Sequence, residues 1–233
     1  MKSLGPRPFR HAKALGSFML ISVLGLISAC QQTRFEALPS GTYSECDPDW
    51  VGGWRIESSD PSKEKDEGPV YWIVDANCAR YQTMEADGAS EDEHEFSIRY
   101  VKQDSRKYLV NAKPNLAEDA SDWDKGFMLI RYDWNGANTI RLFEVDNQLV
   151  AQLILDGEIA GHSEVKTGTD HNGKNKIDSI ENLLAGPTTN TDKVIQRKGV
   201  FKRKPWLILH RVSSDEIAKM RAKFLDQRNP ESG

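Results

Sequence analysis

The sequence predicts a mainly β protein with flanking helices, an α+β fold whose antiparallel strands form a barrel or half-barrel. Two observations carry this prediction. Apolar and polar residues alternate in one segment after another between residues 52 and 145, which is the pattern of half-buried strands. Helical spacing is found only after residue 145, in short segments and in an amphipathic C-terminal stretch.

The first 29 residues have the three parts of an export signal. Four basic residues lie within the first 13 positions, a mostly apolar run covers residues 14–27, and the small residues Ser28 and Ala29 precede Cys30. The apolar run is too short for a comfortable membrane span, which needs about 20 residues. We therefore expect residues 1–29 to be a signal peptide.

The segment ISAC, residues 27–30, resembles the lipobox of bacterial lipoproteins. The resemblance implies that the Cys30 thiol receives a diacylglyceryl group, that cleavage follows just before this residue, and that fatty acids such as palmitate anchor the chain. Gln31 stands where many inner-membrane lipoproteins carry Asp, which implies the outer membrane and a domain facing the periplasm. An ordinary secretory leader with a chance cysteine is the alternative.

Composition fits one domain of ordinary size. The chain has 31 basic and 35 acidic residues, and the leader holds four of the bases and none of the acids, so the mature charge is −8. Such a chain is not an obvious partner for nucleic acid or for an anionic membrane. We expect a flexible lipidated tether over residues 30–45, holding the domain roughly 20 Å from the anchor, and a single β-rich domain over residues 46–233.

With Cys30 lipidated, Cys46 and Cys78 remain as an even pair in an oxidising compartment. We interpret them as a disulfide that pins the start of the domain to an early strand, contributing about 3–4 kcal/mol in the chain-entropy model. Two free thiols or a metal pair are the alternatives, and further metal ligands are lacking nearby in the sequence.

The strands follow in order. After an opening strand at GGWRIE, alternation predicts strands in VYWIVD (70–75), EFSIRYV (95–101), KYLVNA (107–112), FMLIRYDW (127–134), NTIRLFEV (138–145) and PWLILHRV (205–212). Tyr71 and Ile73 should face opposite to Trp72 and Val74. Asn135-Gly136 predicts a hairpin over residues 127–145.

Three helices are expected around these strands. The first has Asp146 as N-cap, an apolar face including Leu149 and Leu153, and Gly157 as its stop. The second covers residues 189–199, with Thr191 capping. The third is an amphipathic C-terminal helix that begins with a capping box from Ser213 to Glu216.

Gly52-Gly53-Trp54 is similar to the Gly-x-Trp of the first strand in lipocalin-like (calycin) proteins. The resemblance implies an antiparallel barrel with an interior pocket, and it extends in general layout to lipocalin-like bacterial lipoproteins. The helices after residue 145 depart from the single flanking helix of that group. The six tryptophans could line such a pocket or fill the core.

The segment DHNGKNKIDSIE, residues 170–181, resembles an EF-hand or dockerin calcium loop. Asp170, Asn172, Asp178 and Glu181 occupy ligand positions of the 12-residue frame. Lys174 places a cation where the fifth ligand belongs, so calcium is disfavoured. The alternative is a polar loop in which Asp178 or Ser179 caps a short helix.

Other clusters have simple interpretations. EHE at 93–95 fits a solvated acidic loop, and His210 fits a hydrogen-bonded histidine at the core or rim. RKGVFKRKP at 197–205 could face lipid phosphates, lipopolysaccharide or an acidic partner, or be a solvated turn.

Known catalytic motifs are lacking, so the sequence predicts a non-enzymatic protein without a cofactor. Two functions are favoured: binding of a small apolar ligand or lipid in a barrel, or a structural or assembly role in the envelope through contacts with other proteins.

Overall fold

The computed structural model describes residues 31–44, 46–58, 69–76, 80–85, 91–95, 97–112, 126–169 and 173–228. In this part of the chain there are thirteen strands, three α-helices and one turn of 3₁₀ helix. The expected mainly β, α+β class is confirmed.

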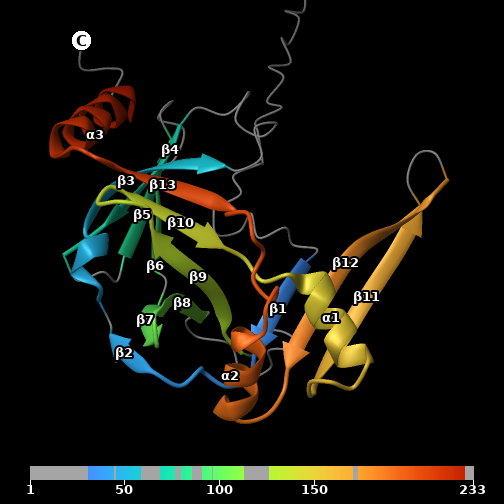
Figure 1. Ribbon diagram of the computed structural model, residues 1–233. Coiled ribbons are helices and arrows are strands. Elements are labelled where there is room, and N and C mark those ends of the chain that lie inside the picture. Colours follow the sequence, from blue (N-terminus) through green and yellow to red (C-terminus); the bar gives the residue numbers. More distant parts are fainter. Residues whose placement is uncertain are drawn as a thin grey trace, which may run out of the picture.

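Ten strands form one antiparallel sheet in the order β2-β7-β8-β9-β10-β13-β3-β4-β5-β6 (Figure 1). Their bounds are β2 Thr42–Ser44, β3 Gly52–Ser58, β4 Val70–Val74, β5 Arg80–Glu85, β6 Glu91–Glu95, β7 Ser97–Gln103, β8 Arg106–Ala112, β9 Met128–Trp134, β10 Thr139–Phe143 and β13 Leu207–Val212. The predicted hairpin over 127–145 is confirmed as β9 and β10. The sheet ends at β2 and β6, and no pairing between described residues closes it into a barrel.

The large sheet is strongly curved, as the packing of Trp50 shows. The Trp50 ring lies 6.1 Å from Trp54 on β3 and 5.9 Å from Tyr100 on β7. Five strand spacings separate β3 from β7, which would be about 24 Å in a flat sheet. Two rings that both contact Trp50 cannot be that far apart, so the sheet bends around this side chain.

The concave face of the sheet is filled with apolar side chains. The inward residues alternate along β3, β4, β9, β10 and β13, as the pleat requires. Trp50 and Trp54 are fully buried and Trp72 is 2 % exposed. The cluster comprises Trp50, Trp54, Trp72, Val74, Tyr100, Leu109, Ile130, Tyr132, Ile140, Leu142, Leu207 and Leu209. The tryptophans of this face therefore form the core.

The convex face is covered by helices, which are α1 Asn147–Leu155, α2 Thr188–Gln196 and α3 Ser214–Arg228. Residues of α1 and α2 pack on outward side chains of β7 to β10, such as Val110 and Phe143. On the other side of the molecule, Ile217 and Met220 of α3 pack on Tyr71 and Ile73. The predicted opposite facing of Tyr71 and Trp72 is confirmed.

The helix ends match the sequence except at α2. Asp146 caps α1 by accepting from the backbone N–H of Leu149 at 3.1 Å, and the Ser213 hydroxyl accepts from the N–H of Glu216 at the start of α3. Thr191 does not cap α2, which begins after Pro187. It lies inside the helix, and its hydroxyl donates to the Ala37 carbonyl at 2.8 Å.

A second sheet has the order β1-β12-β11, with β1 Gln31–Phe35, β11 Gly161–Thr169 and β12 Asn175–Leu184. β1 pairs in parallel with β12, Gln31 opposite Ile180 and Phe35 opposite Leu184. Strands β11 and β12 form a long hairpin, one end of which stands away from the body in Figure 1.

The expected flexible tether over residues 30–45 is wrong for its described part. Residues 31–35 form β1, residues 42–44 form β2, and Phe35 is fully buried. Between the two strands, the Ser40 N–H donates to Asp192 at 2.8 Å. The polar composition of this segment does not reveal β1, because the strand pairs with residues 180–184, far along the chain.

Candidate functional site

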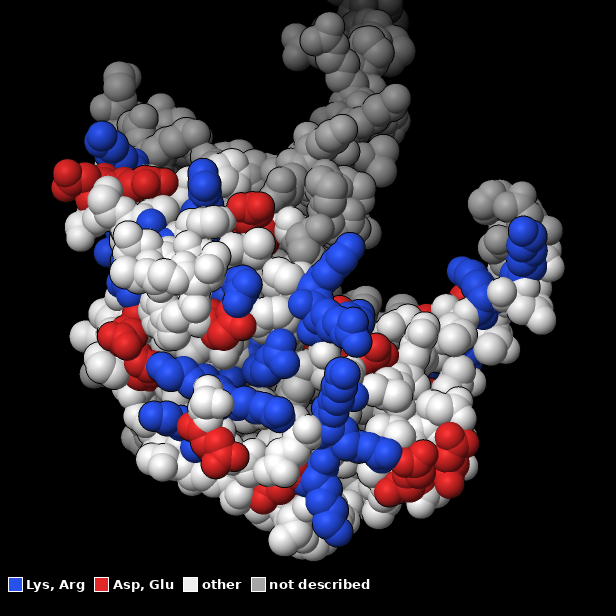
Figure 2. Space-filling model, in the orientation of Figure 1, with Lys and Arg blue, Asp and Glu red and all other residues white. Residues whose placement is uncertain are grey.

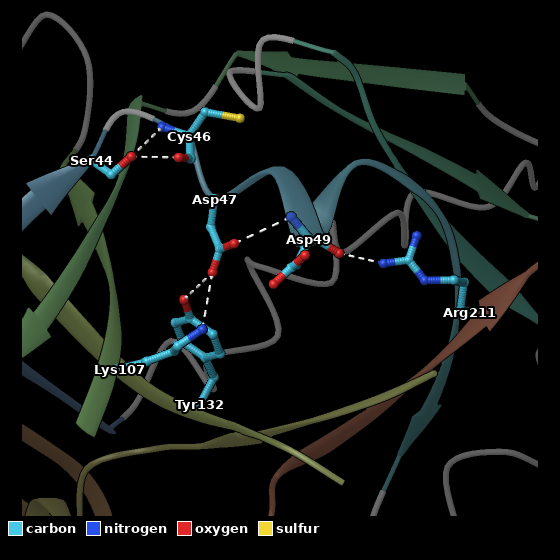
Figure 3. A network of polar contacts seen from close by, with 7 residues as sticks. All are labelled: Ser44, Cys46, Asp47, Asp49, Lys107, Tyr132 and Arg211. Carbon is cyan, nitrogen blue, oxygen red and sulfur yellow. Dashed lines mark hydrogen bonds and ion pairs between the residues drawn. The ribbon is translucent and has the colours of Figure 1, made fainter. Parts of the chain in front are cut away.

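Asp47 organises a network of polar contacts at the end of the concave core (Figure 3). One of its carboxylate oxygens accepts a hydrogen bond from the Tyr132 hydroxyl at 3.0 Å and lies 3.4 Å from Lys107 Nζ. The other accepts from the N–H of Asp49 at 3.2 Å and so caps the 3₁₀ turn η1, Pro48–Trp50. Trp50, the last residue of this turn, packs in the concave core.

Arg211 holds the same turn from the other side (Figure 3). Its guanidinium donates to the Asp49 carbonyl, and to the Val51 carbonyl at 2.8 Å. It also lies over the Trp54 ring, 4.3 Å from the centroid, where a cation is attracted to the π face. Side chains from three strands, β8, β9 and β13, therefore hold η1 in place.

The chemistry of this network is structural. Burial, followed by the negative charge of Asp47, raises the pKa of the Tyr132 hydroxyl well above its ordinary value. Tyr132 therefore stays protonated and acts as a hydrogen-bond donor rather than as a base. The contacts drawn in Figure 3 join these groups to one another and to backbone carbonyls, which is what a clamp on a turn requires.

Cys46, directly before Asp47, is disulfide-bonded. Its predicted partner, Cys78, and the lipobox residue Cys30 lie outside the described residues. The pairing of Cys46 with Cys78 therefore stays a prediction.

The calcium frame over 170–181 is wrong in its second half. Residues 175–184 form strand β12, so neither the 12-residue loop nor the alternative short helix is present. In an extended strand, Asp178 and Glu181 are about 10 Å apart along the chain. Asp178 lies 3.0 Å from Lys176, in an ion pair. Asp170 and Asn172 lie outside the described residues.

Two other predictions concern histidines and acids. His210 is half-buried on β13, and its Nε2 lies 2.8 Å from a carboxylate oxygen of Glu57, so the interpretation as a hydrogen-bonded rim histidine is confirmed. The acidic run EHE does not form a loop, because Glu91–Glu95 is strand β6 at the edge of the large sheet. No cluster of metal-ligating side chains is found among the residues that the structure describes.

A buried polar network that the sequence did not indicate joins β1 to the hairpin and to α1. Thr33 is 4 % exposed, and its hydroxyl donates to Asn147 Oδ1 at 2.7 Å. Asn182 Nδ2 donates to Thr33 Oγ1 at 3.0 Å and to the Asn147 carbonyl at 2.9 Å, while Asn182 Oδ1 accepts from Ser163 at 2.8 Å. These bonds hold β1 in place at Thr33, two residues after the strand begins.

The predicted basic cluster lies on the segment between α2 and β13. We call its five cations, Arg197, Lys198, Lys202, Arg203 and Lys204, the basic strap; all five are exposed. Figure 2 shows Lys and Arg side chains as a band on this face of the molecule, over α2 and the segment that follows it. Arg197 pairs with Glu158 and Lys202 with Glu144. Within the described chain, the other three make no ion pair.

The backbone of the strap is fixed to the body. Val200 and Phe201 are buried between its two groups of cations, and the Val200 carbonyl accepts from the Asp146 N–H at 2.7 Å. Further on, the Lys202 N–H donates to the Glu144 carbonyl at 3.0 Å. The strap is therefore a rigid support that presents its cations to solvent.

The segment that carries the strap leads toward the start of β1. A small cavity of about 30 Å³ is lined by Gln31, Gln32, Glu144 and Trp206, among others, and Trp206 follows the last strap residue, Lys204, by two positions. Because consecutive Cα atoms are 3.8 Å apart, Cys30 is one such step from Gln31, and Lys204 is within about 7.6 Å of Trp206. The predicted lipidation point and the basic strap thus share one end of the domain, which we call the anchor-side end.

Comparison with known proteins gives no relative: no protein-family model, curated protein or solved structure matches the chain significantly. None of the helices in the described ranges is long and apolar enough to cross a membrane.

Proposed function

We propose that this is a lipid-anchored protein of the bacterial outer membrane that faces the periplasm and serves a structural or assembly role through contacts with other envelope proteins. The observation that carries the choice is the filled concave face of the sheet. Trp50, Trp54 and Trp72 occupy the space in which a lipocalin-like protein would hold a ligand. The filled face leaves the surface of the described domain as the part that supports recognition of other proteins.

The anchor rests on the lipobox ISAC and on the position of β1. Two acyl chains hold a protein stably on a bilayer, whereas one holds it only marginally. Since β1 begins at Gln31, directly after the cysteine, a lipidated chain would hold the domain at the membrane surface without an intervening tether. Such an arrangement suits a protein that works at a fixed height above the bilayer.

Binding of a small apolar ligand or lipid is the second candidate. It is supported by the curvature of the sheet and by Gly52-Gly53-Trp54 at the start of β3, the feature shared with lipocalin-like proteins. A ligand on the concave side would have to displace Trp50, and with it the η1 turn that Asp47 and Arg211 clamp.

A native mass spectrum of the folded protein from its own host, extracted in mild detergent, separates these functions. We expect lipidated protein with a co-purifying envelope protein and without a retained apolar ligand. A stoichiometric small molecule, together with a shift of tryptophan emission when fatty acids or phospholipids are added, would overturn the proposal in favour of the ligand-binding function. Fatty-acid labelling tests the anchor separately: equal labelling of wild type and Cys30→Ser would overturn lipidation.

A further inference from the structure

We infer that the anchor-side end of the domain is a docking surface for a bilayer that contains anionic phospholipids. The inference rests on the lipid anchor proposed for Cys30. The basic strap would bind lipid phosphates, and the hairpin residues Val165 and Ile177 would enter the interfacial layer. Three independent features of the described chain support this assignment.

The first feature is the register of β1. Gln31 lies opposite Ile180 of β12, and Ile180 lies opposite Val165 of β11. Val165 is therefore level with the first residue after the anchor. The first five residues of β12 extend beyond that level, by about 16 Å at 3.3 Å per residue. A bilayer that holds Cys30 at its surface therefore has this end of the hairpin beside it.

The second feature is the apolar character of the hairpin at that level. Val165 and Ile177 are 39 % and 42 % exposed, unlike the buried Ile180 on the same sheet. A bulge shifts the pairing between Lys166 and Thr167, so that Thr167 lies opposite Ile177. Because of this shift, Val165 and Ile177 lie on one face of the hairpin. Two exposed apolar side chains on one face of a hairpin are suited to insertion at a lipid interface.

The third feature is the charge of the strap. Lys198, Arg203 and Lys204 make no ion pair with described residues and project from a segment fixed by Val200 and Phe201. Cations near an anionic bilayer strengthen binding by about five-fold each. The charge of −8 expected after removal of residues 1–29 does not oppose this, because surface charges are screened beyond about 8–10 Å and local charge decides docking.

Position favours lipid over an acidic protein as the occupant. Trp206, two residues after Lys204, lines a cavity together with Gln31, so the bilayer that takes the acyl chains is the nearest anionic surface available to the strap. An acidic protein partner would have to reach the strap between the domain and the membrane.

Lysine acetylation of the mature lipidated protein, read by mass spectrometry, tests the inference. The protein is placed in phosphatidylcholine vesicles with or without phosphatidylglycerol. We expect acetylation of Lys198 and Lys204 to fall about five-fold or more with phosphatidylglycerol and to recover at high salt. Lys102 on β7 and Lys219 on α3, both exposed, serve as internal controls and should change little.

A matched pair of variants tests the role of charge. Lys198→Glu/Arg203→Glu/Lys204→Glu removes the unpaired strap cations, and Lys102→Glu/Lys219→Glu/Arg221→Glu makes the same change in net charge elsewhere. Lys202 is present in both and reports on the strap. It should lose its protection in the first variant and keep it in the second.

Each outcome has one meaning. Protein that floats with both kinds of vesicle but shows equal acetylation of Lys198 and Lys204 overturns the docking and leaves the anchor standing. Protein that does not float with either overturns the anchor, and the docking with it. Protection that needs an added envelope protein, and not phosphatidylglycerol, would assign the strap to a protein partner and overturn lipid docking.

Discussion

Asn182 donates a hydrogen bond to the hydroxyl of Thr33 over 3.0 Å, although 149 residues separate the two in sequence. Thr33 stands three positions after the cysteine proposed to carry the anchor. The bond therefore ties the start of the mature chain to strand β12 and, through Asn147, to helix α1. Strand β1 therefore starts one residue after Cys30, which is proposed to carry the anchor.

Removing the Asn182 amide should destabilise this end of the domain. Asn182 is 1 % exposed and makes hydrogen bonds to Thr33, Asn147 and Ser163. Leaving their buried polar groups without partners should lower the free energy of unfolding by about 2–4 kcal/mol in Asn182→Ala. Asn175→Ala, at an exposed position of the same strand, is the control. Equal urea midpoints for the two variants would show that the network contributes little.

Trp50 should be the most sensitive position of the concave core. It is fully buried and contacts the rings of Trp54, Tyr100 and Tyr132. Trp50→Ala should cost about 3–5 kcal/mol of unfolding free energy, because the cavity it leaves is walled by strands that cannot collapse. Leu155→Ala, at a side chain that is 67 % exposed, should stay within about 0.5 kcal/mol of wild type. Urea denaturation measures both, and a near-neutral Trp50→Ala would mean that this space is naturally open.

Stability should decline at alkaline pH because of Tyr132. Its pKa in the folded protein is raised above the ordinary value of 10.0, chiefly by burial. Below pH 10 the hydroxyl is protonated in both states. Above it, the unfolded chain loses the proton while the folded chain keeps it, so stability falls by up to about 1.4 kcal/mol per pH unit.

Tyr132→Phe should reduce that alkaline slope without abolishing it, because burial also raises the pKa of Tyr71 and of Tyr108. The measurement is the free energy of unfolding at a series of pH values from 8 to about 11, comparing slopes rather than absolute stabilities. An unchanged slope in Tyr132→Phe would argue against a buried, protonated hydroxyl on Asp47.

Peptide mapping without reduction should find Cys46 linked to Cys78. The disulfide encloses the first strands of the large sheet, and its loss in Cys46→Ser/Cys78→Ser should lower stability by about 3–4 kcal/mol. Reduction of wild-type protein should reproduce that loss and have no further effect on the double variant. Recovery of Cys78 as a free thiol from freshly prepared native protein would rule the pairing out.

Alternation predicted the strands that have one face in a core. Val70–Val74, Met128–Trp134 and Leu207–Val212 carry their own period of two, and each was placed correctly. Asp146 was predicted as a helix cap because capping is a local contact. The side-chain oxygen of the capping residue accepts from a backbone N–H three residues later, here that of Leu149. Such local signals do not depend on the rest of the fold.

Strand β1 was missed because its partner lies far away in the chain, whereas β11 and β12 were missed although they form a local hairpin. Gln31–Phe35 is polar at its start and pairs with residues 180–184, a relation that no local pattern contains. In β12 the spacing of acids imitated a calcium loop, and the bulge beside Lys166 broke the alternation that would have revealed a strand. The basic strap was visible as a cluster of cations, but its place beside Gln31 required the fold.

Hydrogen exchange of the mature, lipidated protein tests the central claim most directly, namely that the domain begins at the anchor without a tether. Mass spectrometry of peptides covering residues 31–36 reads the amides of β1. We predict that they exchange slowly, at rates comparable to the paired amides of residues 180–184 on β12, because the two strands form one ladder. Exchange of residues 31–36 at the rate of an unstructured chain, with 180–184 still protected, would contradict the account and restore a flexible tether.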